Sequence, residues 1–311
     1  MNKTLIASLA IVALASTAAV ADTRVTYKSA KSTSSYYAMA VQLSEAVKGK
    51  VDVTVEESQG SVQNVKEAVR RTGNYVFTSP PSLIKLAQGG KKMFEGETGY
   101  AVVRSLFPIP SLTMHWVVRQ DSGVMSFADL AGKKFIPGGK GSFGQRQTMS
   151  TFEALGLAGK VDVVDVELNA AVPAIKNNQV VGFATAGSYP APNVTEAAAS
   201  VPIRLLGLSA ADLEKVKGDK LVIPAGTYKG VDQDTTTISL PVIAYTTDKM
   251  DDEAAYQLTK TYWEGKAAMA KANSWWGGVT PAMLTNLGAK VHPGAARYYA
   301  EAGITVPDAF R

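Results

Sequence analysis

The sequence predicts an α/β protein of two lobes, each with a central sheet flanked by helices, joined by two crossing strands. Three observations lead to this prediction. A unit of strand, polar loop and helix occurs three times in the first eighty residues, and such units form parallel sheets covered by helices. Similar units return after a proline-containing strand region. The chain beyond its leader, about 290 residues, also exceeds the usual size of one hydrophobic core.

In the first lobe, short runs of apolar and polar residues predict strands at residues 24–27, 51–56 and 75–77. Each strand is followed by a loop rich in hydroxyl groups and then by a helix. Ligands of parallel sheets bind at the carboxyl ends of the strands. Adjacent helix residues point about 100° apart, so only one of the two tyrosines at the first loop should face a ligand. The candidate ligand-binding residues in these loops are Ser34, Ser35, Tyr36, Tyr37, Ser58, Gln59, Gly60, Ser61, Thr78 and Ser79.

Two strand regions are predicted to connect the lobes. The first covers residues 100–106 and 113–119, with Pro108 and Pro110 interrupting it, and the return strand covers residues 236–245. This places residues 22–107 and 241–311 in lobe I and residues 108–240 in lobe II. Strands at residues 134–136, 161–166 and 180–185 are expected in lobe II. The loop after the last of them should face lobe I across a cleft, through Thr185, Ala186, Gly187 and Ser188.

The segment FIPGGKGSFGQRQT, residues 135–148, has four glycines within seven residues before a helical pattern. Glycines let a backbone approach a ligand closely, and the helix start offers unpaired N–H groups and a positive dipole end. This combination is typical of an anion site; a glycine-rich surface turn is the alternative. A charge-assisted hydrogen bond from a lysine in this loop to a bound anion would contribute on the order of 1.5–3 kcal/mol to the binding free energy. The candidate ligand-binding residues are Lys140, Gly141, Ser142, Phe143, Gly144 and Gln145, with Arg146 adding charge.

The first 21 residues have the pattern of a cleaved export signal. Lys3 precedes a short apolar run, and Ala19-Val20-Ala21 is a small-residue cleavage site. The sequence contains no cysteine, which suits an exported protein without a disulfide framework. Cleavage of the leader would remove Lys3 and lower the net charge of the chain from +5 to +4. The basic residues are scattered, which argues against a nucleic-acid partner. We expect a monomeric periplasmic protein.

Enzymatic and cofactor-dependent functions find less support in the residues. Gly139, Gly141 and Gly144 match the letters of a dinucleotide fingerprint, but an exported chain and the preceding Pro137 argue against a nucleotide, so no cofactor is expected. His115 and His292 have no neighbouring pattern of acid and nucleophile. With no cysteine and two distant histidines, no metal site is expected. A periplasmic hydrolase is therefore the weaker alternative, and no catalytic residue is assigned.

Four segments in order resemble the TAXI-type solute-binding proteins of tripartite ATP-independent periplasmic (TRAP) transporters. They are ESQGSVQNV at residues 57–65, VVRQDSGVMSFADLAGKKF at 117–135, IPAGTYKGVDQDTTTISLP at 223–241 and VHPGAARYYAEAGI at 291–304. The resemblance covers nearly the whole chain beyond the leader. It implies a type II periplasmic binding fold that captures a small organic anion and delivers it to a membrane-embedded TRAP permease.

The sequence departs from the family's pattern at two places. Thr33, Ser34 and Ser35 precede the paired tyrosines, where the family usually has glycines. The family's glycine loop commonly reads like GPPGSGTE, and Lys140 and Gln145 stand here in place of a proline and an acid. A gained cation and a lost acid favour a more anionic ligand, such as a glutamate-like amino acid or a dicarboxylate. The alternatives are a module that presents its ligand to a sensor receptor or to an ABC transporter.

Overall fold

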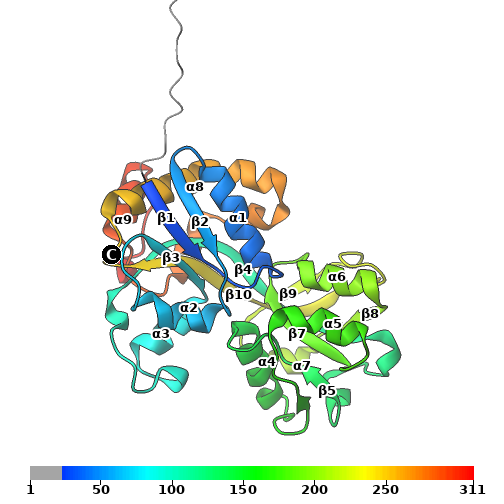
Figure 1. The fold of residues 1–311 in the computed structure, drawn as a ribbon. Coiled ribbons are helices and arrows are strands. Elements are labelled where there is room, and N and C mark those ends of the chain that lie inside the picture. The colour runs from blue at the N-terminus through cyan, green and yellow to red at the C-terminus, as the bar shows by residue number, and fades with distance from the viewer. Residues whose placement is uncertain (1–22) are drawn as a thin grey trace, which may run out of the picture.

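The computed structural model describes residues 23–311; the predicted leader, residues 1–21, lies outside them. Helices and strands alternate along most of this chain (Figure 1). In lobe I they are β1 (Thr23–Lys28), α1 (Ser35–Val47), β2 (Val51–Glu56), α2 (Ser61–Ala68), β3 (Tyr75–Ser79), α3 (Pro81–Gln88), α8 (Asp252–Ala272) and α9 (Pro293–Glu301). The crossing strands are β4 (Val103–Arg119) and β10 (Thr235–Thr247).

The remaining helices and strands belong to lobe II. They are β5 (Lys134–Ile136), α4 (Phe143–Ala154), β6 (Asp162–Val163), α5 (Ala171–Lys176), β7 (Gly182–Gly187), α6 (Pro192–Ser200), β8 (Ile203–Leu205), α7 (Ala210–Leu213) and β9 (Asp219–Ile223). The strand predicted over residues 161–166 is reduced to β6, which pairs with β5 at two positions only. The strand β9 was not predicted; it pairs with β10 along its whole length.

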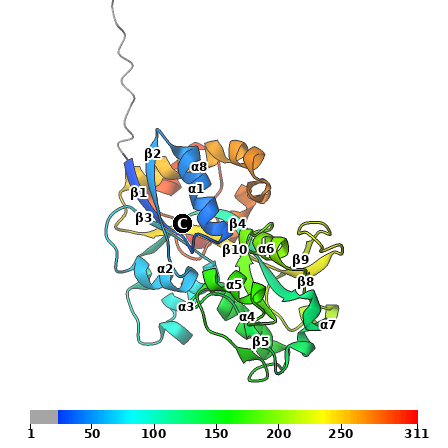
Figure 2. The ribbon, with the colours of Figure 1, turned by 45° about the vertical axis from the view of Figure 1, so that its right-hand side comes forward.

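One ten-stranded sheet runs through both lobes in the order β2-β1-β3-β10-β4-β7-β5-β6, with β8 on β4 and β9 on β10. The first three strands are parallel, as are β7, β5 and β6, whereas β10 and β4 are antiparallel to their neighbours. In lobe I, α1 and α8 cover one face of this sheet, and α2 and α3 cover the other (Figures 1 and 2). This confirms the predicted α/β class with two crossing strands.

The first crossing strand differs from its prediction. Pro108 and Pro110 were expected to interrupt it, but β4 continues through them and pairs with β10 from Val103 to Thr113. The pairing shifts register between Leu240 and Val242 and between Ala244 and Tyr245. Prolines within a sheet are tolerated at such irregular positions. The predicted lobe boundaries near residues 107 and 241 fall inside these shared strands and stay a prediction.

Helix ends form where the sequence supplies capping groups. Ser34 caps α1 by accepting a hydrogen bond from Tyr37 N (3.2 Å), and Ser142 caps α4 by accepting one from Gln145 N (3.1 Å). Both caps stand at the side of the sheet where the two lobes meet. The N-termini of α1 and α4 are thereby fixed close to one another.

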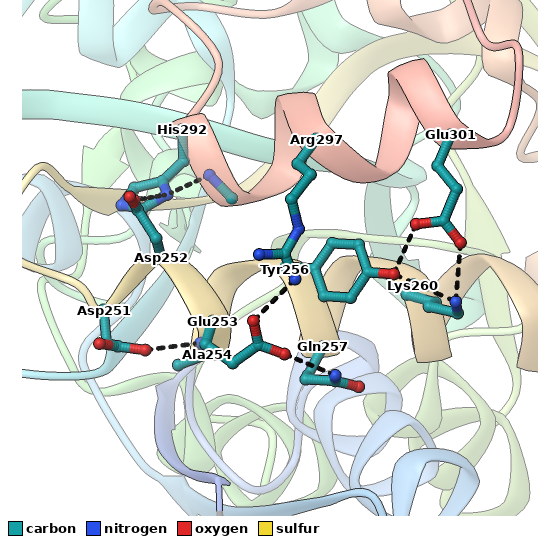
Figure 3. Close-up of polar contacts among 11 residues, drawn as sticks. Asp251, Asp252, Glu253, Ala254, Tyr256, Gln257, Lys260, His292, Arg297 and Glu301 are labelled. Carbon is teal, nitrogen blue, oxygen red and sulfur yellow. Dashed lines mark hydrogen bonds and ion pairs between the residues drawn. The ribbon is translucent and has the colours of Figure 1, made fainter.

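A polar network on the outside of lobe I joins α8 to α9 (Figure 3). The Arg297 guanidinium lies 3.5 Å from the centre of the Tyr256 ring and contacts Glu253 at 2.7 Å. One turn along, Lys260 contacts Glu301 at 2.9 Å. Opposite charges therefore face each other across the two helices, and each such exposed pair contributes about 1 kcal/mol or less.

His115 anchors the crossing strand β4 within lobe II. The residue is 1% exposed, and its ring bonds Thr113 O through Nδ1 (3.1 Å) and the Tyr228 hydroxyl through Nε2 (2.8 Å). That hydroxyl also accepts a hydrogen bond from Ala191 N (2.8 Å). Its own proton therefore points to Nε2, and His115 is neutral with its proton on Nδ1. Burial lowers the pKa of His115 to about 4.

This histidine predicts a pH-dependent stability. Between pH 6.5, the usual histidine pKa, and pH 4, the unfolded chain takes up a proton that the native chain does not, so stability falls as the pH falls. The loss attributable to His115 is about 3 kcal/mol over this window and absent above it. Urea unfolding at pH 7.0 and 4.5 measures it. His115→Gln should be less stable at pH 7.0 but lose less on acidification; equal losses in both proteins would contradict the assignment.

Candidate functional site

A small cavity of about 40 Å³ lies where the two lobes meet. Lobe I contributes the loops after β1 and β2, lobe II contributes the start of α4 and the end of β7, and Leu112 comes from the crossing strand β4. The carboxyl ends of β1, β2 and β7 therefore all point toward it. Ten of the predicted site residues line this cavity: Ser34, Tyr36, Gln59, Gly60, Ser61, Ser142, Phe143, Gly144, Thr185 and Ala186.

The other ten predicted residues do not line this cavity. Lys140 and Gly141 line an adjoining groove of about 540 Å³, together with Gln59, Lys66 and Glu167. Tyr37 does not line the cavity, whereas its neighbour Tyr36 does. Six others form hydrogen bonds with protein groups, namely Ser35, Ser58, Thr78, Ser79, Gln145 and Ser188. Gly187 pairs with Thr113 in the sheet.

Several of these neighbouring hydroxyls hold the loops in place. Ser58 Oγ donates to Ser29 O (2.8 Å) and accepts from Gly60 N (2.9 Å). Thr78 Oγ1 donates to the Tyr27 hydroxyl (2.8 Å), and Ser79 Oγ donates to Ser61 O (2.9 Å). Ser58 and Ser79 thus fix the backbone of Gly60 and Ser61, which line the cavity.

The glycine loop packs tightly against its own helix. Gly138 has a φ of +133°, and a Cβ there would lie 2.4 Å from Gln145 N. A Cβ on Gly139 would lie 2.7 Å from the Cβ of Leu168. Both positions are buried, so this part of the loop is not a solvated surface turn. The glycines bring the first turn of α4, with its unpaired N–H groups and positive dipole end, to the cavity wall.

Three cations surround the cavity at different depths. Lys31, which was not predicted, lines it, and its side chain is 21% exposed. Lys140 is 67% exposed and lies 3.9 Å from Asp165. Arg146 lies over the ring of Phe143, 5.8 Å from its centre, and partial burial lowers its pKa. The position of Lys31 in the hydroxyl-rich loop after β1 is the sequence signal that could have identified it.

Small residues let the lobes approach closely beside the cavity. Ser188 N of lobe II donates to Ser35 Oγ of lobe I (3.0 Å). The Tyr36 hydroxyl donates to Pro110 O on the crossing strand (3.3 Å). A Cβ on Gly60 would lie 3.4 Å from Ser142, across the cavity. The two lobes are therefore in direct contact in this structure.

Neither His115 nor His292 lines the cavity, and both are held by protein groups. His115 is committed to Thr113 and Tyr228, and His292 accepts from Gly294 N (3.2 Å) while bonding Met250 O (3.2 Å). Residues 23–311 contain no cluster of three or more His, Asp or Glu side chains suited to a metal. The polar groups of the cavity are instead hydroxyls, amides, helix N–H groups and one ammonium.

Gly187 allows a test of the lobe contact. In Gly187→Ala the added Cβ would lie 2.4 Å from Ser35 Oγ. This overlap disfavours the closed arrangement by roughly 1–3 kcal/mol. We expect a larger radius of gyration in small-angle X-ray scattering. Adding Ser35→Ala removes the clashing oxygen together with its hydrogen bond from Ser188 N, and should restore the closed dimensions in part. Gly277→Ala, where no atom lies within 4 Å, is the matched control. An unchanged radius for Gly187→Ala would show that this contact does not govern closure.

Comparison with known proteins agrees with this geometry. Among solved structures, the periplasmic binding protein BugD matches with a TM-score of 0.59 at 14% identity, over 91% of this chain and 98% of BugD. MatC from Rhodopseudomonas palustris, solved with bound malate, matches with a TM-score of 0.57 at 8% identity, over 91% of this chain and 97% of MatC. These likenesses show the two-lobed fold of periplasmic binding proteins. No helix within residues 23–311 combines the length and the apolar character that crossing a bilayer requires. The sequence matches the NMT1-like family over residues 28–303, and the chain belongs to this family.

Proposed function

We propose that this chain is a periplasmic solute-binding protein that captures a small organic anion between its lobes. The observation that carries the proposal is the cavity itself, because both lobes and a crossing strand line it. Because about 40 Å³ holds only a few waters, the lobes must part to admit an organic anion, and the ligand contacts both lobes at once only when they close around it. It therefore binds the closed arrangement better and shifts the population toward it.

The chemistry of the wall supports an anionic ligand. The start of α4 supplies N–H groups and a positive dipole end, and Lys31 supplies a full charge. Ser34 and Ser61 add hydroxyl groups from lobe I, and Tyr36, Phe143 and Leu112 give the rest of the wall an apolar character. A compact carboxylate fits this mixture better than a sugar, which needs many paired polar groups. Within the class we propose a glutamate-like amino acid or a dicarboxylate; the malate bound to MatC, a protein of the same fold, favours the dicarboxylate.

The proposed partner is a TRAP permease of the TAXI type. This part of the proposal rests on the four ordered segments that resemble TAXI proteins and on membership of the NMT1-like family. Uptake would then depend on an ion gradient and on this chain. ATP-driven uptake would point to an ABC transporter, and control of a receptor without uptake would point to a sensor.

Ligand screening tests the anion proposal. At a ligand concentration of one hundred times Kd, binding stabilises the native state by about 2.7 kcal/mol, which raises Tm by roughly 5 °C. We expect such shifts with small mono- or dicarboxylates in differential scanning fluorimetry. Calorimetry should then show an affinity that falls as salt rises, because the attraction is electrostatic. Binding of neutral sugars or cations only would overturn the proposal.

Lys140 should act at the entrance to the cavity. Its ammonium lies in the adjoining groove, exposed and near Asp165, and exposed ion pairs contribute about 1 kcal/mol or less. Lys140→Ala is therefore expected to weaken anion affinity by less than tenfold, with the larger effect on the association rate at low salt. Stopped-flow and calorimetric measurements separate the two effects. A tenfold or greater loss of affinity at high salt would instead indicate a direct bond to the ligand.

A further inference from the structure

An ion pair joins the two lobes at the edge of the cavity. Lys31 Nζ, in the loop between β1 and α1, lies 3.5 Å from Glu167 Oε2, which precedes the short 3-10 helix Leu168–Ala170 of lobe II. Within residues 23–311, every other ion pair connects groups of the same lobe. Lys31 and Glu167 are thus the charged link between the lobes in this arrangement.

The pair stands between the cavity and the open groove. Lys31 lines the cavity, Glu167 lines the groove, and Leu168, next to Glu167, lines the cavity again. Gln59 borders both spaces. An anion that reaches the cavity therefore meets an ammonium that already has a carboxylate beside it.

The contact between the two groups is incomplete. Glu167 Oε2 is buried and makes no hydrogen bond in the described part of the chain, although the residue as a whole is partly exposed. At 3.5 Å from Lys31 Nζ, this oxygen gains Coulomb attraction without a good hydrogen bond. Leaving a buried carboxylate oxygen without a donor is unfavourable. The partnership is consequently weak, and a better placed anion can replace Glu167.

We propose that Glu167 is a built-in competitor for Lys31, and that the anionic ligand displaces it when it binds. This inference rests on the proposed function, because it requires an anion in the cavity. In the exchange Lys31 passes from Glu167 to the ligand, and the Glu167 carboxylate turns toward the groove and its solvent. Glu167 thereby lowers the affinity of the site for anions and sets how strong an anion must be to bind.

Two substitutions with opposite expected effects test this. Glu167→Gln keeps the shape but removes the competing charge, so anion affinity should rise about fivefold, the upper end of what a partly exposed ion pair contributes. Lys31→Gln removes the ammonium and should weaken affinity about tenfold or more. In the double variant Lys31→Gln/Glu167→Gln, the gain from the glutamate substitution should largely disappear, a non-additivity that a double-mutant cycle measures. Calorimetry with the carboxylate selected in the screen gives all four affinities.

Glu45→Gln is the matched control. Its carboxylate also lies 3.5 Å from a lysine, Lys48, but within lobe I at the far end of α1, so its loss should leave the affinity unchanged. If wild type binds an anion and Glu167→Gln binds it equally or less tightly, the competitor role is wrong while the proposed function stands. If neither protein binds any carboxylate, both fail. Tighter binding by Glu167→Gln alone, with an unaltered control, supports the inference.

Discussion

The pairing of β4 with β10 is the constraint on which the rest of the structure depends. These two strands belong to both lobes and carry the sheet from one to the other. Strands on either side of them end at the same junction, so the loops after β1 and β2 meet the start of α4 and the end of β7. The site is therefore a consequence of the connection, because neither lobe has the complete wall by itself.

Closure at this junction requires small side chains as much as polar ones. Gly187 faces Ser35, and Gly60 faces Ser142, at distances where a further carbon atom would be tight or would clash. The serines serve twice: Ser142 caps α4, and Ser35 accepts a hydrogen bond from the backbone of lobe II. The hydroxyl-rich loops thus shape the contact between lobes, in addition to any role toward a ligand.

Local sequence patterns predicted the elements whose stability is local. The strand at residues 51–56 has the predicted bounds, and the glycine loop leads into α4 as expected. What the patterns missed depends on distant partners. The crossing strand continues through Pro108 and Pro110 because β10 pairs with it, and β9 exists because β10 offers it an edge. Sequence likewise shows Lys31 as one more loop cation, since its position beside Glu167 arises only when lobes far apart in sequence meet.

This meeting of charges also limits what a ligand can gain. A ligand shifts closure only by its differential affinity for the closed arrangement. Contacts that the lobes make directly, such as Ser35 with Ser188, favour closure whatever occupies the cavity. An anion that takes Lys31 from Glu167 gains only the difference between its own bond and the one it replaces. For a well-placed, strongly charged anion the new bond to Lys31 is clearly stronger than the bond to Glu167, so binding gains free energy. For a weakly charged or badly placed anion the two bonds are about equal, and the gain vanishes. The Lys31–Glu167 pair would therefore act as a threshold on ligand strength, a selectivity that the shape of the cavity alone does not supply.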